Sequence, residues 1–209
     1  LLGDDLKYVV QEHPLGTGNA VSAARQAIPP NTELLLVTYG DTPLLRTDSL
    51  RGLLNRHHLT GADFSLLTAM IDQPLSYGRI ERDSSLRVTA IIEPEDLEQA
   101  AVDLREINVG SYVAAPGVLL RQIDALAANC EHRLTEVARR FLATGSSVIT
   151  YRIFDTDEVQ GINSPEELQQ AALITVKENT RYDTFRDRVM FPIINRYGQT
   201  IGFGARAMG

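Results

Sequence analysis

Hydrophobic residues along the chain form short runs separated by polar and glycine-containing segments. One run, ELLLVTYGD at residues 33–41, is continuously apolar until it reaches Tyr39, Gly40 and Asp41. An unbroken run of this kind predicts a strand buried on both faces, as in the centre of a parallel sheet. Further strands are predicted at residues 7–11, 62–71, 107–115 and 147–154, with a hairpin at 77–93.

Segments with helical periodicity lie between these predicted strands. Helices are expected at residues 18–27, 47–58, 117–128 and 134–144, and after Asn163-Ser164-Pro165, where proline would occupy the first turn. Alternating strands and helices predict a layered α/β fold with a mostly parallel sheet. The last segment, residues 182–209, predicts a β-hairpin that turns near residues 196–198 and buries its apolar face against the α/β domain or a second subunit.

Composition sets the class of protein. The chain has 209 residues, 44% of them hydrophobic, which is enough to bury the core of one domain with an appendage. Cys130 is the single cysteine, so it forms no intrachain disulfide and is expected to be a free thiol in a reducing cytoplasm. No apolar run is long enough to span a bilayer and no signal peptide is evident. We therefore expect a soluble cytoplasmic protein without membrane contact.

Charge is unevenly distributed along the chain. The formal net charge is -7, yet residues 177–209 contain six basic and three acidic side chains. This tail therefore carries +3 and the remainder -10. The acidic remainder argues against a nucleic-acid surface that covers the whole molecule, whereas the tail is chemically different.

Residues that end strands are the first candidates for a binding site, because ligands of α/β sheets bind at the carboxyl ends of strands. Asp41 follows a buried strand, where a carboxylate can hold a divalent cation or simply serve as a turn or capping residue. The stretch Gly16-Thr17-Gly18 has the character of a phosphate nest at a helix N-terminus. It matches neither the P-loop nor the full dinucleotide fingerprint, so it leaves its ligand undecided.

Six short motifs occur together in one order along residues 1–173. They are QEHPLGTGNAV, LLLVTYGDTPLL, YGRIERD, AIIEPED, EINVGSYVA and VQGINSPEEL. This series resembles the N-acetylglucosamine-1-phosphate uridylyltransferases. The resemblance implies a Rossmann-like nucleotidyltransferase domain over residues 1–173. Since no hexapeptide repeats are present, it implies only the uridylyltransferase half of the bifunctional members of that family.

The resemblance also implies which part of a ligand the glycine-containing stretch would contact. In the family the matching residues contact the nucleotide base, so Gln11 would bind uracil while Gly16 and Thr17 close over the ring. An amide suits this task because it offers both a donor and an acceptor. Asp41 and Asn163 match the two side chains that hold Mg²⁺.

A second group of residues matches the family's sugar pocket. Gly78, Glu93 and Asn108 correspond to residues around the N-acetylglucosamine moiety, and Tyr39 lines the same pocket. Read without the resemblance, the first three are a hairpin glycine, a surface glutamate and a turn asparagine. The implied partners are UTP and N-acetylglucosamine 1-phosphate, which react to UDP-N-acetylglucosamine and pyrophosphate. The attacking phosphate needs no general base, so no catalytic side chain is assigned.

The sequence departs from this family at its start. The family's domain begins with a strand, a G-x-G-T-R-M loop and a lysine that hold the triphosphate, whereas Leu1 corresponds to a point inside that domain. We therefore expect weak turnover or none from this chain. The missing strand would leave a sheet edge that favours association into a homo-oligomer.

Residues 182–209, YDTFRDRVMFPIINRYGQTIGFGARAMG, resemble a different family, the catalytic core of bacterial DNA primase. Arg206 corresponds to an arginine that contacts template. The alternative is a structural hairpin whose arginines, Arg186, Arg188 and Arg206, are solvated or salt-bridged. Residues 174–209 are thus expected to form a primase-like hairpin tail. Two further hypotheses remain, an α/β scaffold whose tail binds single-stranded nucleic acid and a folding chimera without activity.

Overall fold

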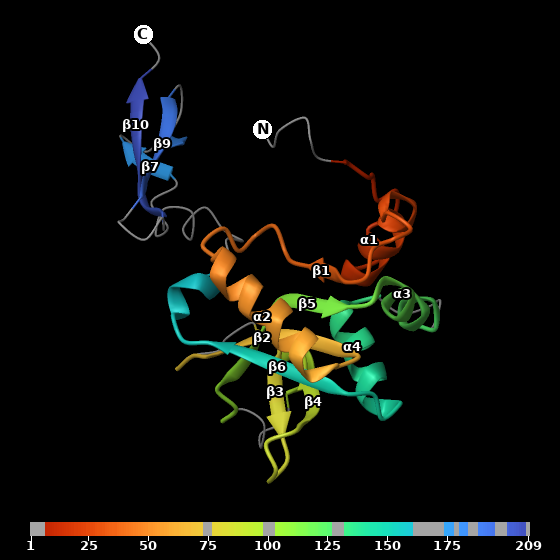
Figure 1. Cartoon of the computed structure of the whole chain (residues 1–209). Coiled ribbons are helices and arrows are strands. Elements are labelled where there is room, and N and C mark those ends of the chain that lie inside the picture. Colours follow the sequence, from red (N-terminus) through yellow and green to blue (C-terminus); the bar gives the residue numbers. More distant parts are fainter. Residues whose placement is uncertain are drawn as a thin grey trace. The chain divides into compact units, whose positions relative to one another are not determined.

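The computed structural model describes residues 7–72, 77–97, 103–126 and 132–160, together with the backbone of four strands between residues 174 and 207. The chain divides into two compact units. Residues 1–40 and 44–160 form the first unit, and residues 41–43 and 161–209 form the second. Figure 1 shows the helices and strands of both.

The first unit contains the helices and the larger sheet. Its helices are α1 (Thr17–Ala23), α2 (Thr47–Thr60), α3 (Pro116–Asp124) and α4 (Leu134–Ala143), with 3-10 turns η1 (Ala24–Ala27), η2 (Pro94–Asp96) and η4 (Thr156–Val159). Its strands are β1 (Leu35–Val37), β2 (Phe64–Met70), β3 (Arg79–Arg82), β4 (Val88–Ile92), β5 (Glu106–Ala114) and β6 (Val148–Ile153). The predicted helices at 18–27, 47–58, 117–128 and 134–144 and the hairpin at 77–93 are therefore confirmed.

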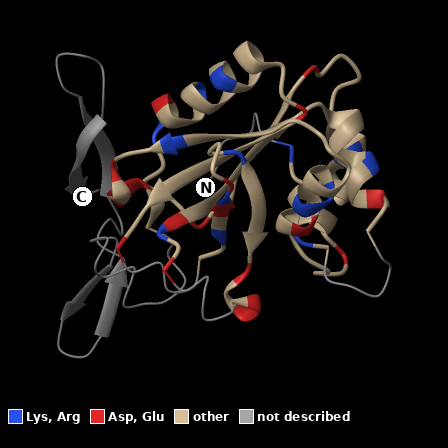
Figure 2. Ribbon diagram, turned by 90° about the horizontal axis from the view of Figure 1, so that it is seen from below, with Lys and Arg blue, Asp and Glu red and all other residues tan. Residues whose placement is uncertain are grey.

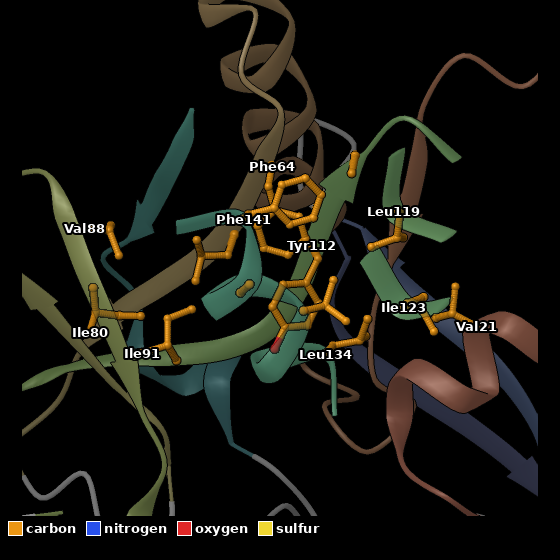
Figure 3. Packing of buried hydrophobic residues seen from close by; sticks show 14 residues of the cluster. Val21, Phe64, Ile80, Val88, Ile91, Tyr112, Leu119, Ile123, Leu134 and Phe141 are labelled. Carbon is orange, nitrogen blue, oxygen red and sulfur yellow. The ribbon is translucent and has the colours of Figure 1, made fainter. Parts of the chain in front are cut away.

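Helices cover both faces of this sheet. One apolar cluster joins α1, α3 and α4 to Phe64 and Tyr112, and Phe64 stacks on Phe141 of α4 with ring centroids 4.7 Å apart; Figure 3 shows this packing. The other cluster joins Leu53 of α2 to Leu67 and neighbouring sheet residues. Alternate residues of β2 thus enter opposite layers, which explains why the strand is buried from Phe64 to Ala69.

The α/β class is confirmed, but the expectation of a mostly parallel sheet is wrong. The strand order is β4-β3-β5-β2-β6, with β1 also paired to β5. Only β2 and β6 pair in parallel, whereas the other described pairs of this sheet are antiparallel. An unbroken apolar run indicates that a strand is buried on both faces. Helices on both sides of a sheet bury a strand in this way whether its neighbours run parallel or antiparallel to it.

Two N-terminal predictions also need correction. Residues 7–11 form no strand, and the side chains of residues 7–10 are exposed, with Val10 82% exposed. The run at 33–41 contains only the three-residue strand β1, which is half-buried and pairs, among the described strands, with β5 alone. Strand β1 thus lies at the margin of the described sheet, where fewer neighbours bury its apolar side chains.

Helix α2 is capped by a residue distant in sequence. The N-cap is Arg46, whose side chain makes no capping hydrogen bond. Glu158 of η4 accepts hydrogen bonds from the Arg46 backbone N–H at 3.0 Å and from the Ser49 hydroxyl at 2.6 Å. A buried carboxylate thus satisfies donors that the helix start leaves open and complements the helix dipole.

The second unit contains two antiparallel pairs. Strands β7 (Ile174–Lys177) and β8 (Thr180–Asp183) form one, and β9 (Arg188–Ile194) and β10 (Thr200–Ala207) form the other. The predicted C-terminal hairpin is confirmed by the register that pairs Ile194 with Thr200 and Arg188 with Ala207. The expected turn at 196–198 and the helix expected after Pro165 lie outside the described residues.

Strand β5 carries a two-residue bulge in the middle of the sheet. Leu66 of β2 lies opposite Tyr112 and Thr68 lies opposite Asn108, so two residues of β2 span four of β5. Gly110, inside the bulge, has a φ of +84°, and a Cβ atom there would overlap the Tyr39 ring. The position therefore needs glycine for its backbone conformation and for the close approach of the ring.

An ion pair links the β3–β4 hairpin to the sheet. Arg82 donates from Nε and Nη2 to the Glu106 carboxylate at 2.6 and 2.5 Å, and also to the Thr150 hydroxyl at 2.8 Å. Burial tends to raise the pKa of Glu106, but the hydrogen bonds and positive charge of Arg82 lower it overall. Figure 2 shows that basic and acidic residues are interspersed along the described ribbon.

We expect Glu106→Gln to lower the free energy of unfolding by about 1.5–3 kcal/mol near pH 7, because a charged acceptor is lost from a largely buried arginine. Since the folded-state pKa of Glu106 is lowered, its contribution is present above the unfolded pKa and is lost as the pH falls through the folded value. The gap between wild type and variant should therefore shrink below about pH 4. Urea denaturation across this range measures it, with Glu81→Gln, an exposed carboxylate of the same hairpin, as control.

We expect Gly110→Ala to destabilise the first unit by at least about 1–3 kcal/mol, because alanine would take a left-handed conformation and displace the Tyr39 ring. Gly117→Ala is the matched control, since its Cβ would lie 3.6 Å from an Arg121 nitrogen in ordinary contact. Thermal and urea unfolding of both variants measure the difference. Equal stability of the two would contradict the account of the bulge.

Candidate functional site

The Gln11 side chain closes the loop that precedes α1. Its Nε2 donates to the Gly16 carbonyl at 3.1 Å and to Asn19 Oδ1 at 2.6 Å. Gly16 is the N-cap of α1 and has a φ of +107°, a conformation that favours glycine. Because these two bonds engage both Nε2 hydrogens, the amide keeps Oε1 as its acceptor for a ligand.

This loop is fastened to the start of α4. The His132 backbone donates to the Leu15 carbonyl at 2.8 Å and accepts from the Gly18 N–H at 2.6 Å. The Thr17 hydroxyl accepts from the Leu134 N–H at 2.9 Å. A Cβ at Gly18 would lie 2.8 Å from the His132 carbonyl oxygen, so this close approach requires glycine. Thr17 is predicted to close over a base. Its hydroxyl also makes a hydrogen bond that connects this loop to α4.

The four residues predicted for the sugar pocket lie close together. A Cβ built on Gly78 would lie 3.4 Å from Glu93 Oε2 and 3.8 Å from Asn108 Cβ. The Gly78 carbonyl accepts from the Asn108 N–H at 2.9 Å. Tyr39 reaches the same region through Tyr112, with the two hydroxyl oxygens 3.5 Å apart. Residues separated by up to 69 positions in sequence thus form one cluster of polar groups.

Asn108 is buried, and the nitrogen and the oxygen of its side-chain amide each make one hydrogen bond. Its Nδ2 donates to the Tyr112 hydroxyl at 2.7 Å, and its Oδ1 accepts from the Gly110 N–H at 3.2 Å. It is 8% exposed, whereas Tyr112 is completely buried. Burial raises the pKa of Tyr112 well above its ordinary value, and the nearby Tyr39 and Glu93 act in the same direction. The Tyr112 hydroxyl therefore stays protonated and neutral.

The segment that carries Glu93 is held by two arginines. One is Arg139 of α4 and the other is Arg133, which directly precedes this helix. Arg139 donates to the Ile91 carbonyl at 2.7 Å and to the Asp96 carboxylate at 3.0 Å. Arg133, the N-cap of α4, donates to Glu95 at 3.3 Å. The Asp96 N–H in turn donates to the Glu93 carbonyl at 3.0 Å. Helix α4 therefore supports the segment around Glu93 as well as the Gln11 loop.

Three further predicted residues, Asp41, Asn163 and Arg206, belong to the second unit. Asp41 is exposed, and Asn163, its predicted partner for Mg²⁺, lies outside the described residues, as does Cys130. Arg206 belongs to β10, opposite Val189 in the hairpin. The described residues contain no group of three or more His, Cys, Asp or Glu side chains that could hold a metal ion. The roles of these three residues stay predictions.

Three supporting residues were not anticipated from the sequence: Gly110, Tyr112 and Arg139. A tyrosine inside the apolar strand INVGSYVAA was a usable signal for Tyr112, because a buried hydroxyl needs a partner. Arg139 gave no such signal, since one arginine on an amphipathic helix is usually solvated. Across the described residues, no helix has the length and apolar character required to cross a membrane.

Comparison with known proteins gives two matches along the chain. Residues 3–156 match the family described as nucleotidyl transferase. Residues 141–209 match the family described as DNA primase catalytic core, N-terminal domain. The two resemblances drawn from the motifs are thus confirmed, and the matches overlap only at residues 141–156.

Curated relatives extend the first match. The bifunctional protein GlmU of Heliobacterium modesticaldum is 40% identical over 176 residues, which cover 83% of this chain and 38% of the relative. GlmU of Pelobacter propionicus is 37% identical over 173 residues, covering 81% of this chain and 38% of the relative. The chain spans about two fifths of the length of these relatives. Because the first family match covers well over half of its residues, the chain belongs to the nucleotidyl transferase family.

Proposed function

We propose that the first unit binds a uridine nucleotide and N-acetylglucosamine 1-phosphate, as the nucleotide- and sugar-binding part of a uridylyltransferase domain. The observation that carries this proposal is the cluster of Gly78, Glu93 and Asn108, which β3, the end of β4 and β5 bring to one place. The relatives named GlmU support the same assignment.

The chemistry of the cluster suits a neutral sugar. The Glu93 carboxylate is an acceptor for hydroxyl groups, and the Asn108 amide retains one Nδ2 hydrogen and one Oδ1 lone pair after its two internal bonds. Gly78 leaves the space of a methyl group open between these two side chains. A ligand with several hydroxyl groups and an amide can satisfy both side chains, whereas a carboxylate beside Glu93 would be repelled.

The Gln11 loop suits a uracil base. With its Nε2 hydrogens bonded to Gly16 and Asn19, Gln11 offers an acceptor oxygen. Uracil carries a hydrogen on N3 that can donate to such an oxygen, whereas cytosine has an acceptor at that position. The loop should therefore prefer UTP over CTP.

Mg²⁺ completes the proposal. Asp41 and Asn163 offer carboxylate and amide oxygens, which are the ligands that this hard cation prefers. The bound ion would neutralise charge on the phosphates during attack of the sugar phosphate on the α-phosphate of UTP, with release of pyrophosphate. The protein's own part is to hold the base and the sugar so that this attack is in line. A pyrophosphate-release assay with UTP, N-acetylglucosamine 1-phosphate and Mg²⁺ measures turnover.

A second function is supported by the match of residues 141–209 to the DNA primase core and by the β9–β10 hairpin. In this alternative the tail contacts single-stranded nucleic acid through Arg206. Titration with a fluorescent single-stranded oligonucleotide at two salt concentrations tests it, because phosphate contacts weaken as salt rises. Arg206→Ala should then reduce binding, and equal binding by both proteins would remove Arg206 from the interface.

We expect Gly78→Ala to weaken binding of N-acetylglucosamine 1-phosphate and UDP-N-acetylglucosamine by about tenfold or more, because the methyl group fills the space between Glu93 and Asn108. Stability should change little, since the nearest neighbour of that Cβ would lie 3.4 Å away, in ordinary contact. Calorimetric titration measures binding, with UTP, CTP and Gly117→Ala as controls. Unchanged sugar affinity in Gly78→Ala would contradict the position of the pocket, and equal affinity for UTP and CTP would contradict the role of Gln11.

We expect Asp41→Ala to abolish any Mg²⁺ dependence of uridine nucleotide binding, because the cation would lose its only charged protein ligand in the proposed pair. The measurement is UTP affinity at several Mg²⁺ concentrations. Asp48→Ala, which removes another exposed carboxylate, is the control. The same Mg²⁺ dependence in wild type and Asp41→Ala would exclude Asp41 from the metal site.

A further inference from the structure

The hydroxyl of Tyr112 is a polar group in an otherwise apolar layer. The ring is completely buried and packs against Phe64, with centroids 5.6 Å apart, and edge-on against Tyr39 at 6.2 Å. Its oxygen accepts from Asn108 Nδ2 at 2.7 Å. A phenylalanine would supply the same packing, so the hydroxyl itself requires an explanation.

The bulge in β5 makes this bond geometrically accessible. Residues four apart in a regular strand lie about 13 Å apart, and their parallel side chains would not meet in this way. Here two extra residues in β5, one of them Gly110, alter that spacing between Asn108 and Tyr112. The local backbone is thus shaped so that the amide and the hydroxyl meet.

The orientation of the Asn108 amide follows from its two neighbours. The Gly110 backbone N–H can only donate, so the atom that faces it must be Oδ1. The Tyr112 hydroxyl therefore faces Nδ2. A flipped amide would place two donors against each other at Gly110. In a buried site this would destabilise the folded protein, because neither donor would have an acceptor.

We propose that Tyr112 is a positioning residue: its hydroxyl anchors the nitrogen of the Asn108 amide, whose orientation the Gly110 N–H sets, and so holds this amide in place. The ligand then meets an N–H donor and an oxygen acceptor at fixed places beside Glu93, and the pocket distinguishes sugars by where they carry complementary groups. The part of this inference that concerns the ligand rests on the proposed function. The locked amide itself is a property of the protein alone.

The protein without ligand tests the lock directly. In nuclear magnetic resonance spectra of the full chain, one Asn108 side-chain amide hydrogen should be strongly protected from exchange with solvent, and Asn108→Asp identifies the resonance by its disappearance. In Tyr112→Phe this protection should be lost. Rapid exchange of both hydrogens in wild type would overturn the proposal, as would protection that persists in Tyr112→Phe.

Ser65→Ala is the matched control. It too removes a buried hydroxyl from the sheet, one that lies 2.7 Å from His57 Nδ1 in the layer beneath α2. We expect both variants to lose a comparable amount of stability, but only Tyr112→Phe to lose the exchange protection of Asn108. This result would show that Tyr112 acts on Asn108 and not through a general destabilisation of the sheet. Loss of that protection in both variants would overturn the proposal.

Titration tests the consequence for recognition. Tyr112→Phe should bind N-acetylglucosamine 1-phosphate about tenfold more weakly than wild type, while its UTP affinity stays within about twofold, because only the sugar meets the amide. Equal loss for both ligands, or no loss for either, would overturn the recognition role. If wild type binds neither ligand, the proposed function and this role fail together, whereas the exchange measurement still decides the lock.

Discussion

The bulge in β5 is the constraint on which the rest of the candidate site depends. Its left-handed Gly110 lets the Tyr39 ring approach the strand and places a backbone N–H on the Asn108 amide. The same bulge makes the Tyr112 hydroxyl reachable from that amide. An ordinary β-strand at this position would keep the core but separate these groups, so the site needs an irregularity in the middle of its sheet.

Helix α4 provides a second common support. Its apolar face enters the core through Phe141, while residues at its start bind the Gln11 loop and its arginines bind the segment around Glu93. One helix therefore fixes the distance between the loop proposed for the base and the pocket proposed for the sugar. Because Arg139 also bonds to the Ile91 carbonyl, the position of Glu93 depends on α4 as much as on its own strand.

The C-terminal part of the chain poses a different problem. Strands β9 and β10 pair in the register of a hairpin, and the match to the primase core covers them. The nucleotidyl transferase match ends at residue 156, close to the boundary between the two compact units at residues 160 and 161. The end of the nucleotidyl transferase match thus lies near the structural division, whereas the primase match begins at residue 141, inside the first unit.

The sequence alone determined most of the element types, the α/β class and most of the residues now found together, because periodicity and short motifs are local properties. It could not determine strand direction, since burial of Leu66 and Leu67 on opposite faces looks the same in parallel and antiparallel pairs. It also could not find the bond from Asn108 to Tyr112 or the arginine support of Glu93. These depend on a bulge and on contacts between segments about 40 to 50 residues apart, which only the tertiary structure decides.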